Sequence, residues 1–201
     1  MSNEPKTRRG RVSRERIVER AAELVAERGV QGTRLDEVLA AAGASKSQLY
    51  HYFTDRDQLV EAAVARRCEQ VVAGLTETFA EVATLDELER VLAGFIALYE
   101  QSPSGCPIGS LASEVADRNE GAREQVVVAF ATWERVYAQA FERMRERGEL
   151  RADASPEALA TAVLASLEGG LLLSQTRRDA ASLRIAVDAA LGYLRTFMSP
   201  D

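Results

Sequence analysis

Residues 33–53 read TRLDEVLAAAGASKSQLYHYF, and this stretch decides the fold of the chain. Apolar residues recur at helical spacing as far as Gly43, and Ser45 then stands where the N-cap of a second short helix is expected. The stretch therefore predicts two helices, over residues 34–42 and 46–53, joined by a tight turn. The apolar side chains expected to lock these helices together are Val38, Leu39, Leu49 and Phe53.

Two short helices packed in this way form a helix-turn-helix, and the second helix is just long enough to lie in a DNA major groove. Its outward side chains are small, polar or aromatic, with no carboxylate that phosphates would repel. They are Ser45, Lys46, Ser47, Gln48, Tyr50, His51 and Tyr52. Such groups can donate hydrogen bonds to phosphate oxygens or base edges. For Tyr52, packing within the core of the head is an equally good alternative.

Helical spacing and capping residues predict an all-α chain of nine helices, because the period-two alternation of strands is absent. The other seven helices are expected over about 14–28, 55–82, 84–101, 107–117, 121–147, from 155–157 onward, and 179–198. Thr33 and Asp36 resemble a capping box at the start of the helix over 34–42.

Charge is unevenly distributed along the chain. The formal net charge is −6, yet the first 20 residues hold seven basic side chains against three acidic ones. An acidic body with a basic leading segment can orient on a polyanion without binding it everywhere. Any surface that binds nucleic acid is therefore expected to be local and near the N-terminus.

Composition also argues against several classes of protein. Cys68 and Cys106 are too few and too far apart for a disulfide framework or a metal cluster, and the single histidine, His51, cannot build a metal site or a catalytic triad. No nucleophile–base pair and no glycine-rich phosphate loop is found, so we expect no enzyme, no catalytic residue, no metal and no cofactor.

The longest apolar stretch covers residues 158–173 and is broken by Glu168 and the glycine pair that follows it. This pattern favours a buried or interface helix over a membrane span. The basic N-terminus is not followed by an apolar run, so a secretory signal is not expected. Both observations predict a protein of the cytoplasm that does not bind membranes.

The residues around the turn resemble the DNA-binding signature of the TetR (tetracycline-repressor) family over about residues 14–60. The residues of this chain that align with the signature are Thr33, Val38, Leu39, Ala42, Gly43, Ala44, Ser45, Lys46, Leu49, Tyr50, Tyr52, Phe53, Arg56 and Leu59. At Val25, Leu39, Ala44 and Arg56 the chain departs from the usual residue, but each change is apolar-for-apolar or like-charge. The resemblance implies a homeodomain-like head over residues 13–57 after a flexible basic arm over 1–12. It also implies a helical ligand-binding and dimerisation domain over 58–201.

The same resemblance implies specific DNA contacts. Thr33 and Lys46 are expected to hold phosphates, and Gln48 and Ser47 are expected to read base edges, since an amide can bond adenine at two atoms. The full expected set is Thr33, Arg34, Ser45, Lys46, Ser47, Gln48, Tyr50, His51 and Tyr52. The basic arm is either a minor-groove contact or a solvating tail.

In this family the remaining helices bind a small effector. The ligand-binding residues expected here are Phe95, Tyr99, Cys106, Leu111, Phe130, Trp133, Tyr137 and Glu168. Aromatic residues at helical spacing more often belong to the hydrophobic core, which is the alternative interpretation of these residues. Glu168 interrupts an apolar helix and must find a polar partner, either on a ligand or across a dimer. An apolar, partly aromatic effector would fit these residues.

Residues 104–111 resemble a Gly-Cys-Pro segment of one subset of the family. Cys106 stands at the expected start of a helix, where backbone N–H groups favour a thiolate. Reaction of Cys106 with an electrophile would then release DNA. The alternative is a small buried residue at a tight junction.

The last two expected helices contain Gly169, Gly170 and Gly192, which permit close helix contacts. They are interpreted as a four-helix homodimer interface, with interior core as the alternative. The sequence thus indicates a dimeric regulator, most simply a repressor of a near-palindromic double-stranded DNA operator. A small apolar or electrophilic effector would release it. The alternative function is a ligand-binding or scaffold protein that does not bind DNA.

Overall fold

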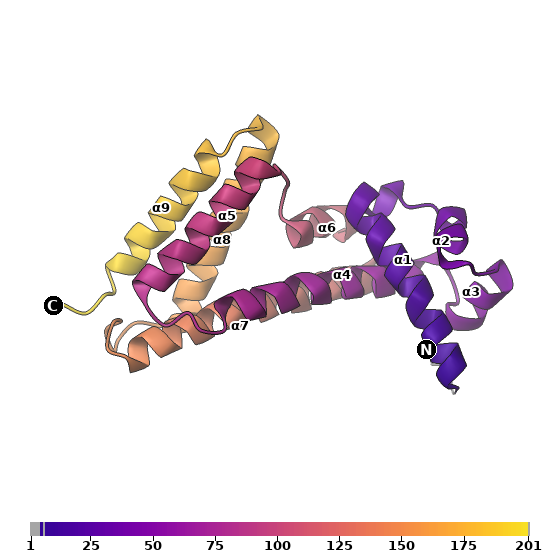
Figure 1. Cartoon of the computed structure of the whole chain (residues 1–201), viewed down its shortest axis with the longest axis horizontal. Coiled ribbons are helices and arrows are strands. Elements are labelled where there is room, and N and C mark those ends of the chain that lie inside the picture. The colour runs from indigo at the N-terminus through magenta and orange to yellow at the C-terminus, as the bar shows by residue number, and fades with distance from the viewer. Residues whose placement is uncertain (1–4, 6, 201) are drawn as a thin grey trace. The chain divides into compact units, whose positions relative to one another are not determined.

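The structure is a computed structural model that describes residues 5 and 7–200. Within those residues every regular element is a helix (Figure 1). The helices are α1 (Arg8–Gly32), α2 (Leu35–Ala42), α3 (Lys46–Tyr52), α4 (Arg56–Phe79), α5 (Leu85–Gln101), α6 (Pro107–Val115), α7 (Glu120–Glu146), α8 (Pro156–Arg177) and α9 (Ala181–Arg195). The all-α prediction is confirmed, and the nine expected helices are all present in the described part of the chain.

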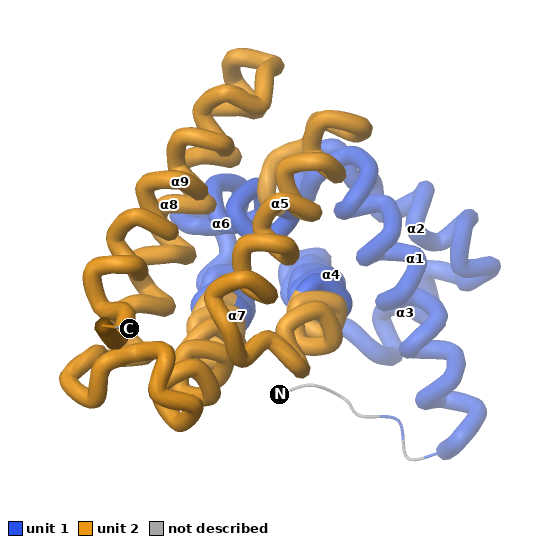
Figure 2. The backbone as a smooth tube through the Cα atoms, turned by 60° about the vertical axis from the view of Figure 1, so that its left-hand side comes forward, with its two compact units in different colours: residues 1–71, 107–129 blue, residues 72–106, 130–201 orange. Residues whose placement is uncertain are grey.

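The chain folds into two compact units (Figure 2). Unit 1 comprises residues 1–71 and 107–129, and unit 2 comprises residues 72–106 and 130–201. Helices α4 and α7 each contribute residues to both units. The domain boundary expected after residue 57 therefore falls inside unit 1, because α6 packs on α1 and the start of α7 lies against the start of α4.

Helix α1 begins earlier than its sequence pattern indicated. Thr7 is the N-cap, and its hydroxyl accepts a hydrogen bond from the backbone N–H of Gly10 at 3.1 Å. Residues 8–12 are helical, which corrects the expectation of a flexible arm through residue 12; residues 1–4 and 6 lie outside the described residues. The earlier start has two causes: Thr7 is a suitable N-cap, and the arginines that follow it are good helix formers.

The end of α1 differs from its prediction in one detail. Gly29 interrupts the helix with φ 72°, in the left-handed region that glycine adopts without strain. The Thr33 hydroxyl donates to the Gly29 carbonyl oxygen at 2.8 Å. Thr33 thus closes α1, and the expected capping box with Asp36 is wrong. The N-cap of α2 is Arg34, which makes no side-chain capping bond.

Helices α8 and α9 form the tightest pair in unit 2. A Cβ atom placed on Gly170 would lie 2.6 Å from the Cβ of Ala186 and 3.2 Å from the Cα of Leu183. At the end of this pair the buried Ser174 hydroxyl accepts a hydrogen bond from the Leu183 N–H at 2.8 Å. By length and composition α8 could cross a membrane. A single helix of this kind is weak support for a membrane span, since core helices of folded domains can be equally long and apolar.

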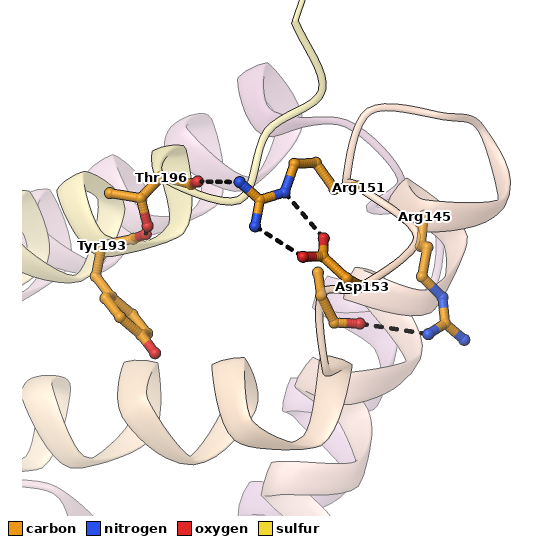
Figure 3. A network of polar contacts seen from close by, with 6 residues as sticks. Arg145, Arg151, Asp153, Tyr193 and Thr196 are labelled. Carbon is orange, nitrogen blue, oxygen red and sulfur yellow. Dashed lines mark hydrogen bonds and ion pairs between the residues drawn. The ribbon is translucent and has the colours of Figure 1, made fainter.

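A set of polar contacts fastens the end of α9 to the loop between α7 and α8 (Figure 3). Arg151 forms a two-pronged ion pair with Asp153, at 2.9 and 3.1 Å, and also donates to the Thr196 carbonyl oxygen at 3.3 Å. Its backbone N–H bonds the Phe197 carbonyl oxygen at 2.9 Å. The arginine therefore satisfies carbonyl groups that the end of α9 leaves free.

We predict that Gly170→Ala lowers the stability of the protein by about 1–3 kcal/mol, because α8 and α9 must move apart to admit the new methyl group. Gly94→Ala is the matched control. A Cβ at Gly94 would meet nothing within 4 Å, so alanine should stabilise α5 by about 0.5–1 kcal/mol. Urea denaturation followed by circular dichroism measures both changes. Equal midpoints for the two variants would contradict the close approach of α8 and α9.

Candidate DNA-binding and ligand-binding sites

One glycine and one capping box build the turn between α2 and α3. Gly43 ends α2 at φ 55° and ψ 43°, a left-handed conformation. The Ser45 hydroxyl accepts a hydrogen bond from the Gln48 N–H at 3.2 Å, and Gln48 Oε1 accepts one from the Ser45 N–H at 2.9 Å. Two donors that the start of α3 would leave unpaired are thus satisfied. The predicted turn and cap are confirmed.

The inner side of α3 is held by apolar packing. Leu49, Val38 and Phe53 are each at most 2% exposed. The guanidinium of Arg14 lies 5.0 Å from the centre of the Phe53 ring, a cation–π contact between α1 and the end of α3. With its inner side fixed on three apolar residues, α3 has little freedom to rotate about its axis.

The outer surface of the head carries most of the predicted DNA contacts. The exposed ones are Arg34, Ser45, Lys46, Ser47, Gln48, Tyr50 and His51. Tyr50 is 56% exposed, an unusual state for a large aromatic side chain. Apart from Arg34, these residues belong to α3 or its N-cap, so one short helix presents nearly all of the expected contact groups.

Two predicted DNA contacts lie differently. Tyr52 is only 7% exposed and meets His51 edge-on with ring centroids 5.1 Å apart. The core-packing alternative is therefore correct for Tyr52, because Leu49 and Tyr52 share the inner side of α3 at a spacing of three. Thr33 is half-buried, and its hydroxyl already donates its proton to the Gly29 carbonyl oxygen. In this state the hydroxyl can accept a hydrogen bond but cannot donate one to a phosphate.

Sequence reasoning missed an acidic partner on the same surface. Lys46 Nζ lies 3.3 Å from Asp36 Oδ1, and both side chains are well exposed. Asp36 stands in the first turn of α2, where the helix dipole favours a carboxylate. The acid-free surface deduced from α3 alone therefore has a carboxylate at its edge. Asp36 was predicted to form a capping box with Thr33, so its pairing with Lys46 was not expected.

Two side chains tie the head to the rest of unit 1. Arg56, at the start of α4, donates to the Val30 carbonyl oxygen at 3.2 Å. Glu114 of α6 accepts a hydrogen bond from the Gln31 backbone N–H at 3.0 Å. A Cβ on Gly29 would lie 2.5 Å from Glu114 Oε1, so α6 reaches the interruption of α1 itself.

Unit 2 contains polar groups that are buried without hydrogen-bond partners. They include the Tyr137 hydroxyl, Trp133 Nε1, the Tyr99 hydroxyl and Glu168 Oε1. Trp133 and Tyr137 contact edge-to-face with ring centroids 6.1 Å apart. Burial raises the pKa of Tyr137 above its ordinary value; the Trp133 indole opposes this rise, although the two groups do not reach hydrogen-bonding geometry. Glu168 and Cys106 add to the rise, so both lie close enough to Tyr137 to act on it electrostatically.

Aromatic rings extend this cluster. Phe79 lies 4.7 Å from Tyr137 between ring centroids, and Phe95 stacks on Phe79 at 6.4 Å. Phe130 stacks on Trp133, also at 6.4 Å. Four of the eight predicted ligand-binding residues are thus joined by ring contacts, directly or through Phe79, and Glu168 interacts with one of them, Tyr137. The five are Phe95, Phe130, Trp133, Tyr137 and Glu168.

The three other predicted pocket residues are all buried. Cys106 interacts with Glu168, Tyr99 is 5% exposed with an unpaired hydroxyl, and Leu111 is 4% exposed in unit 1. Burial raises the pKa of the Glu168 carboxyl, and the hydrogen bond from the Cys106 thiol partly offsets that rise. A carboxylate beside a buried thiol opposes the formation of a thiolate, which disfavours the reactive interpretation of Cys106.

The second cysteine is also unreactive in character. Burial raises the pKa of Cys68 to about 11, an effect to which Glu69 adds and which Arg67 opposes. Within the described residues no group of three or more His, Cys, Asp or Glu side chains could hold a metal ion.

A groove of about 590 Å³ runs between α7 and α8 in unit 2, but half of its ten lining residues are charged, and some of its polar side chains pair with one another. Thr161 donates to Glu134 at 3.0 Å, and Arg145 lies 2.7 Å from Glu142. None of the predicted ligand-binding residues lines this groove. The aromatic cluster around Glu168, whose polar groups are unpaired, is the stronger candidate for a ligand site.

Comparison with known proteins agrees with this architecture. Residues 17–63 match the family model of bacterial regulatory proteins, tetR family, and residues 84–190 match the tetracyclin repressor-like C-terminal domain. An uncharacterised HTH-type transcriptional regulator of Mycobacterium tuberculosis is 34% identical over 182 residues, which cover 83% of this chain and 86% of the relative.

Two further proteins are similar over most of their length. The HTH-type transcriptional repressor DhaR of a Mycobacterium species is 25% identical, over 83% of this chain and 84% of its own. A transcriptional regulator from Cytophaga hutchinsonii has a similar structure, with a TM-score of 0.81 at 18% identity over 98% of this chain and all of that one. Family members are DNA-binding regulators rather than enzymes. The chain therefore belongs to the TetR family, as a transcriptional regulator with a helix-turn-helix DNA-binding head.

Proposed function

We propose that this regulator is a repressor that binds a near-palindromic DNA operator as a homodimer in the cytoplasm and leaves it when a small molecule binds unit 2. The observation that carries the proposal is the outer surface of α3, which is polar, exposed and fixed from behind by Leu49. A relative named as a repressor, DhaR, supports repression rather than activation. Selection of bound fragments from genomic DNA tests the function: an enriched site with two-fold symmetry is expected, and no enrichment would contradict it.

In this proposal α3 lies in the major groove. Lys46 and Tyr50 are directed to the phosphate backbone, with Arg34 and His51 beside them, and Ser47 and Gln48 are directed to base edges. Before DNA binds, Lys46 is paired with Asp36. The lysine then exchanges a carboxylate for a phosphate, and Asp36 limits attraction to DNA of any sequence.

The switch is proposed to use helices that already connect the parts of the chain. α4 is one continuous helix that contributes to both units, and α6 follows Cys106 directly. Since Glu114 of α6 bonds the backbone beside Gly29, a displacement of α6 would reach α1. A ligand must favour the released state by several kcal/mol to empty an occupied operator. Of the two expected effector types, the electrophilic one is disfavoured, because Cys106 is buried beside Glu168.

We predict that Lys46→Ala weakens binding to all DNA sequences by a similar factor and reduces the slope of log affinity against log salt by about 1. Asp36→Asn is the opposite test, since it frees Lys46 and removes a negative charge. It should tighten binding to DNA of random sequence. Fluorescence anisotropy with operator and random duplexes over a salt series measures both. A Lys46→Ala protein that loses affinity for the operator alone would contradict the assignment to phosphate.

We predict that Gln48→Ala reduces discrimination at one base pair by about 1–3 kcal/mol. Gln48 also caps α3, so loss of the cap must be separated from loss of a base contact. Gln48→Glu provides that separation, because glutamate keeps the capping box but has no amide N–H and repels phosphate. Both variants should lose the preference for one base pair, while only Gln48→Ala should destabilise the head. Unchanged preference in Gln48→Glu would exclude Gln48 from base reading.

The homodimer is proposed to form through α8 and α9. Large apolar side chains on these helices remain exposed: Leu172, Leu173, Ile185 and Tyr193. We predict that Ile185→Glu, which places a charge at a side chain 69% exposed, gives a monomer with much weaker operator binding. Leu98→Glu on α5, at 62% exposed, is the control and should stay dimeric. Sedimentation equilibrium distinguishes the two; a dimeric Ile185→Glu protein would contradict this interface.

The alternative function, a ligand-binding or scaffold protein without DNA binding, rests on the aromatic cluster of unit 2 alone. The exposed set around Lys46 and Tyr50 argues against it. Ligand binding without enrichment of any DNA site would favour it.

A further inference from the structure

The Glu168 carboxylate is the only acidic group among the buried, unpartnered side-chain atoms of the described residues. Glu168 is half-buried, its Oε1 has no hydrogen-bond partner, and its other interaction is with the Cys106 thiol. Among the residues that the structure describes, burial and the Cys106 hydrogen bond are what shift the pKa of Glu168, and no basic side chain takes part. An ionised carboxylate removed from water without a cation is costly, and proteins rarely retain one that is unpaired.

Tyr137, whose hydroxyl interacts electrostatically with Glu168, belongs to a cluster of rings that is suited to a cation. Trp133 and Tyr137 are 6% and 1% exposed, and their rings meet edge-to-face at 6.1 Å. Phe130 stacks on Trp133 and Phe79 packs on Tyr137, so the ring system continues on both sides. Aromatic ring faces attract cations, with tryptophan the strongest, and the attraction grows when water is excluded.

The unpaired polar atoms specify the kind of cation. Glu168 Oε1 requires a hydrogen-bond donor, and the unpaired Tyr137 hydroxyl can accept a second one. A protonated amine supplies both donors, whereas a quaternary ammonium supplies none. A flat apolar group attached to the amine would be received by the neighbouring phenylalanine rings.

We infer that the effector is an organic amine, positively charged and joined to an aromatic or other flat apolar group, whose ammonium pairs with Glu168 beside Trp133 and Tyr137. This inference rests on the proposed function and names the ligand class for the same site. Binding is non-covalent, so Cys106 serves as a neighbour of the carboxylate and undergoes no reaction.

The chain contains its own reporter, because Trp133 is its sole tryptophan. Three probes of nearly equal shape separate the contributions: 2-phenylethylamine carries the ammonium, 2-phenylethanol a neutral donor, and n-propylbenzene neither. Titration of the full-length protein with each probe should give a saturable change in tryptophan emission for the amine. The amine should bind at least about tenfold more tightly than the alcohol, as a desolvated ion pair with cation–π contact implies.

Two variants locate the charge. Glu168→Gln should weaken amine binding at least about tenfold and leave alcohol binding nearly unchanged. Glu134→Gln, on the wall of the charged groove, is the control and should leave both unchanged. Tighter binding of the alcohol or hydrocarbon than of the amine, or full amine affinity in Glu168→Gln, would overturn the inference.

The pH dependence gives a second readout that does not depend on a variant. Burial raises the pKa of Glu168 in the free protein, and the cation favours the ionised form. Amine binding should therefore weaken as the pH falls through that raised pKa, with proton uptake by Glu168, whereas 2-phenylethanol binding should stay level. The titratable groups that interact with Glu168 are the Cys106 thiol and the Tyr137 hydroxyl, and burial raises the pKa of Tyr137 well above this range. A flat profile for the amine would contradict the pairing.

Operator binding, measured on the same protein preparations, separates this inference from the proposed function. Intact operator binding with no amine-specific signal would refute the ligand class and leave the repressor proposal standing. A Glu168→Gln protein that becomes monomeric while retaining amine affinity would assign the carboxylate to the partner subunit, and the inference would fail.

Discussion

The DNA-binding surface depends on the burial of Leu49. This side chain has no exposed surface, and Val38 and Phe53 beside it are almost as deeply buried. Burial of such a side chain contributes about 1.5–3 kcal/mol, and here it also determines direction, because a helix fixed along its inner side must present the opposite side outward. The Gly43 turn and the Ser45–Gln48 capping box add the geometry, but without the apolar contact α3 would have no defined orientation toward a duplex.

Local chemistry made much of this predictable. The helix over 34–42, the glycine turn and the serine cap each follow from residues within one turn of helix, and the structure confirms them. Capping residues were harder to assign than helices. Thr33 closes α1 instead of opening α2, and Thr7 caps α1, which begins at Arg8, six residues before the predicted first residue. Domain grouping was the least predictable, since it depends on contacts between residues far apart in sequence. Gln31 after the α1 interruption bonds Glu114 of α6, and Gly121 at the start of α7 lies against Glu61 of α4.

For the two candidate sites, residue type and spacing identified which residues take part but not which side chains contact one another. The outward residues of α3 followed from helical periodicity, apart from Tyr52, whose position three residues after Leu49 places it on the buried side. The pairing of Lys46 with Asp36 joins two helices and has no signature in either one. In unit 2 the sequence marked Glu168 as a carboxylate in need of a partner. Only the structure shows that Glu168 interacts with the Cys106 thiol and the Tyr137 hydroxyl, and that the Tyr137 ring in turn contacts Trp133. No basic side chain of the described residues pairs with its Oε1.

The most direct test of the central claim asks which groove of DNA this fixed surface enters. Methylation interference on a selected operator reports this, because methyl groups on guanine N7 occupy the major groove and those on adenine N3 the minor groove. The account predicts that guanine N7 methylation blocks binding in two clusters, with centres one helical turn or a multiple of about 10 base pairs apart. Interference confined to adenine N3, or a single cluster with no symmetric counterpart, would contradict it.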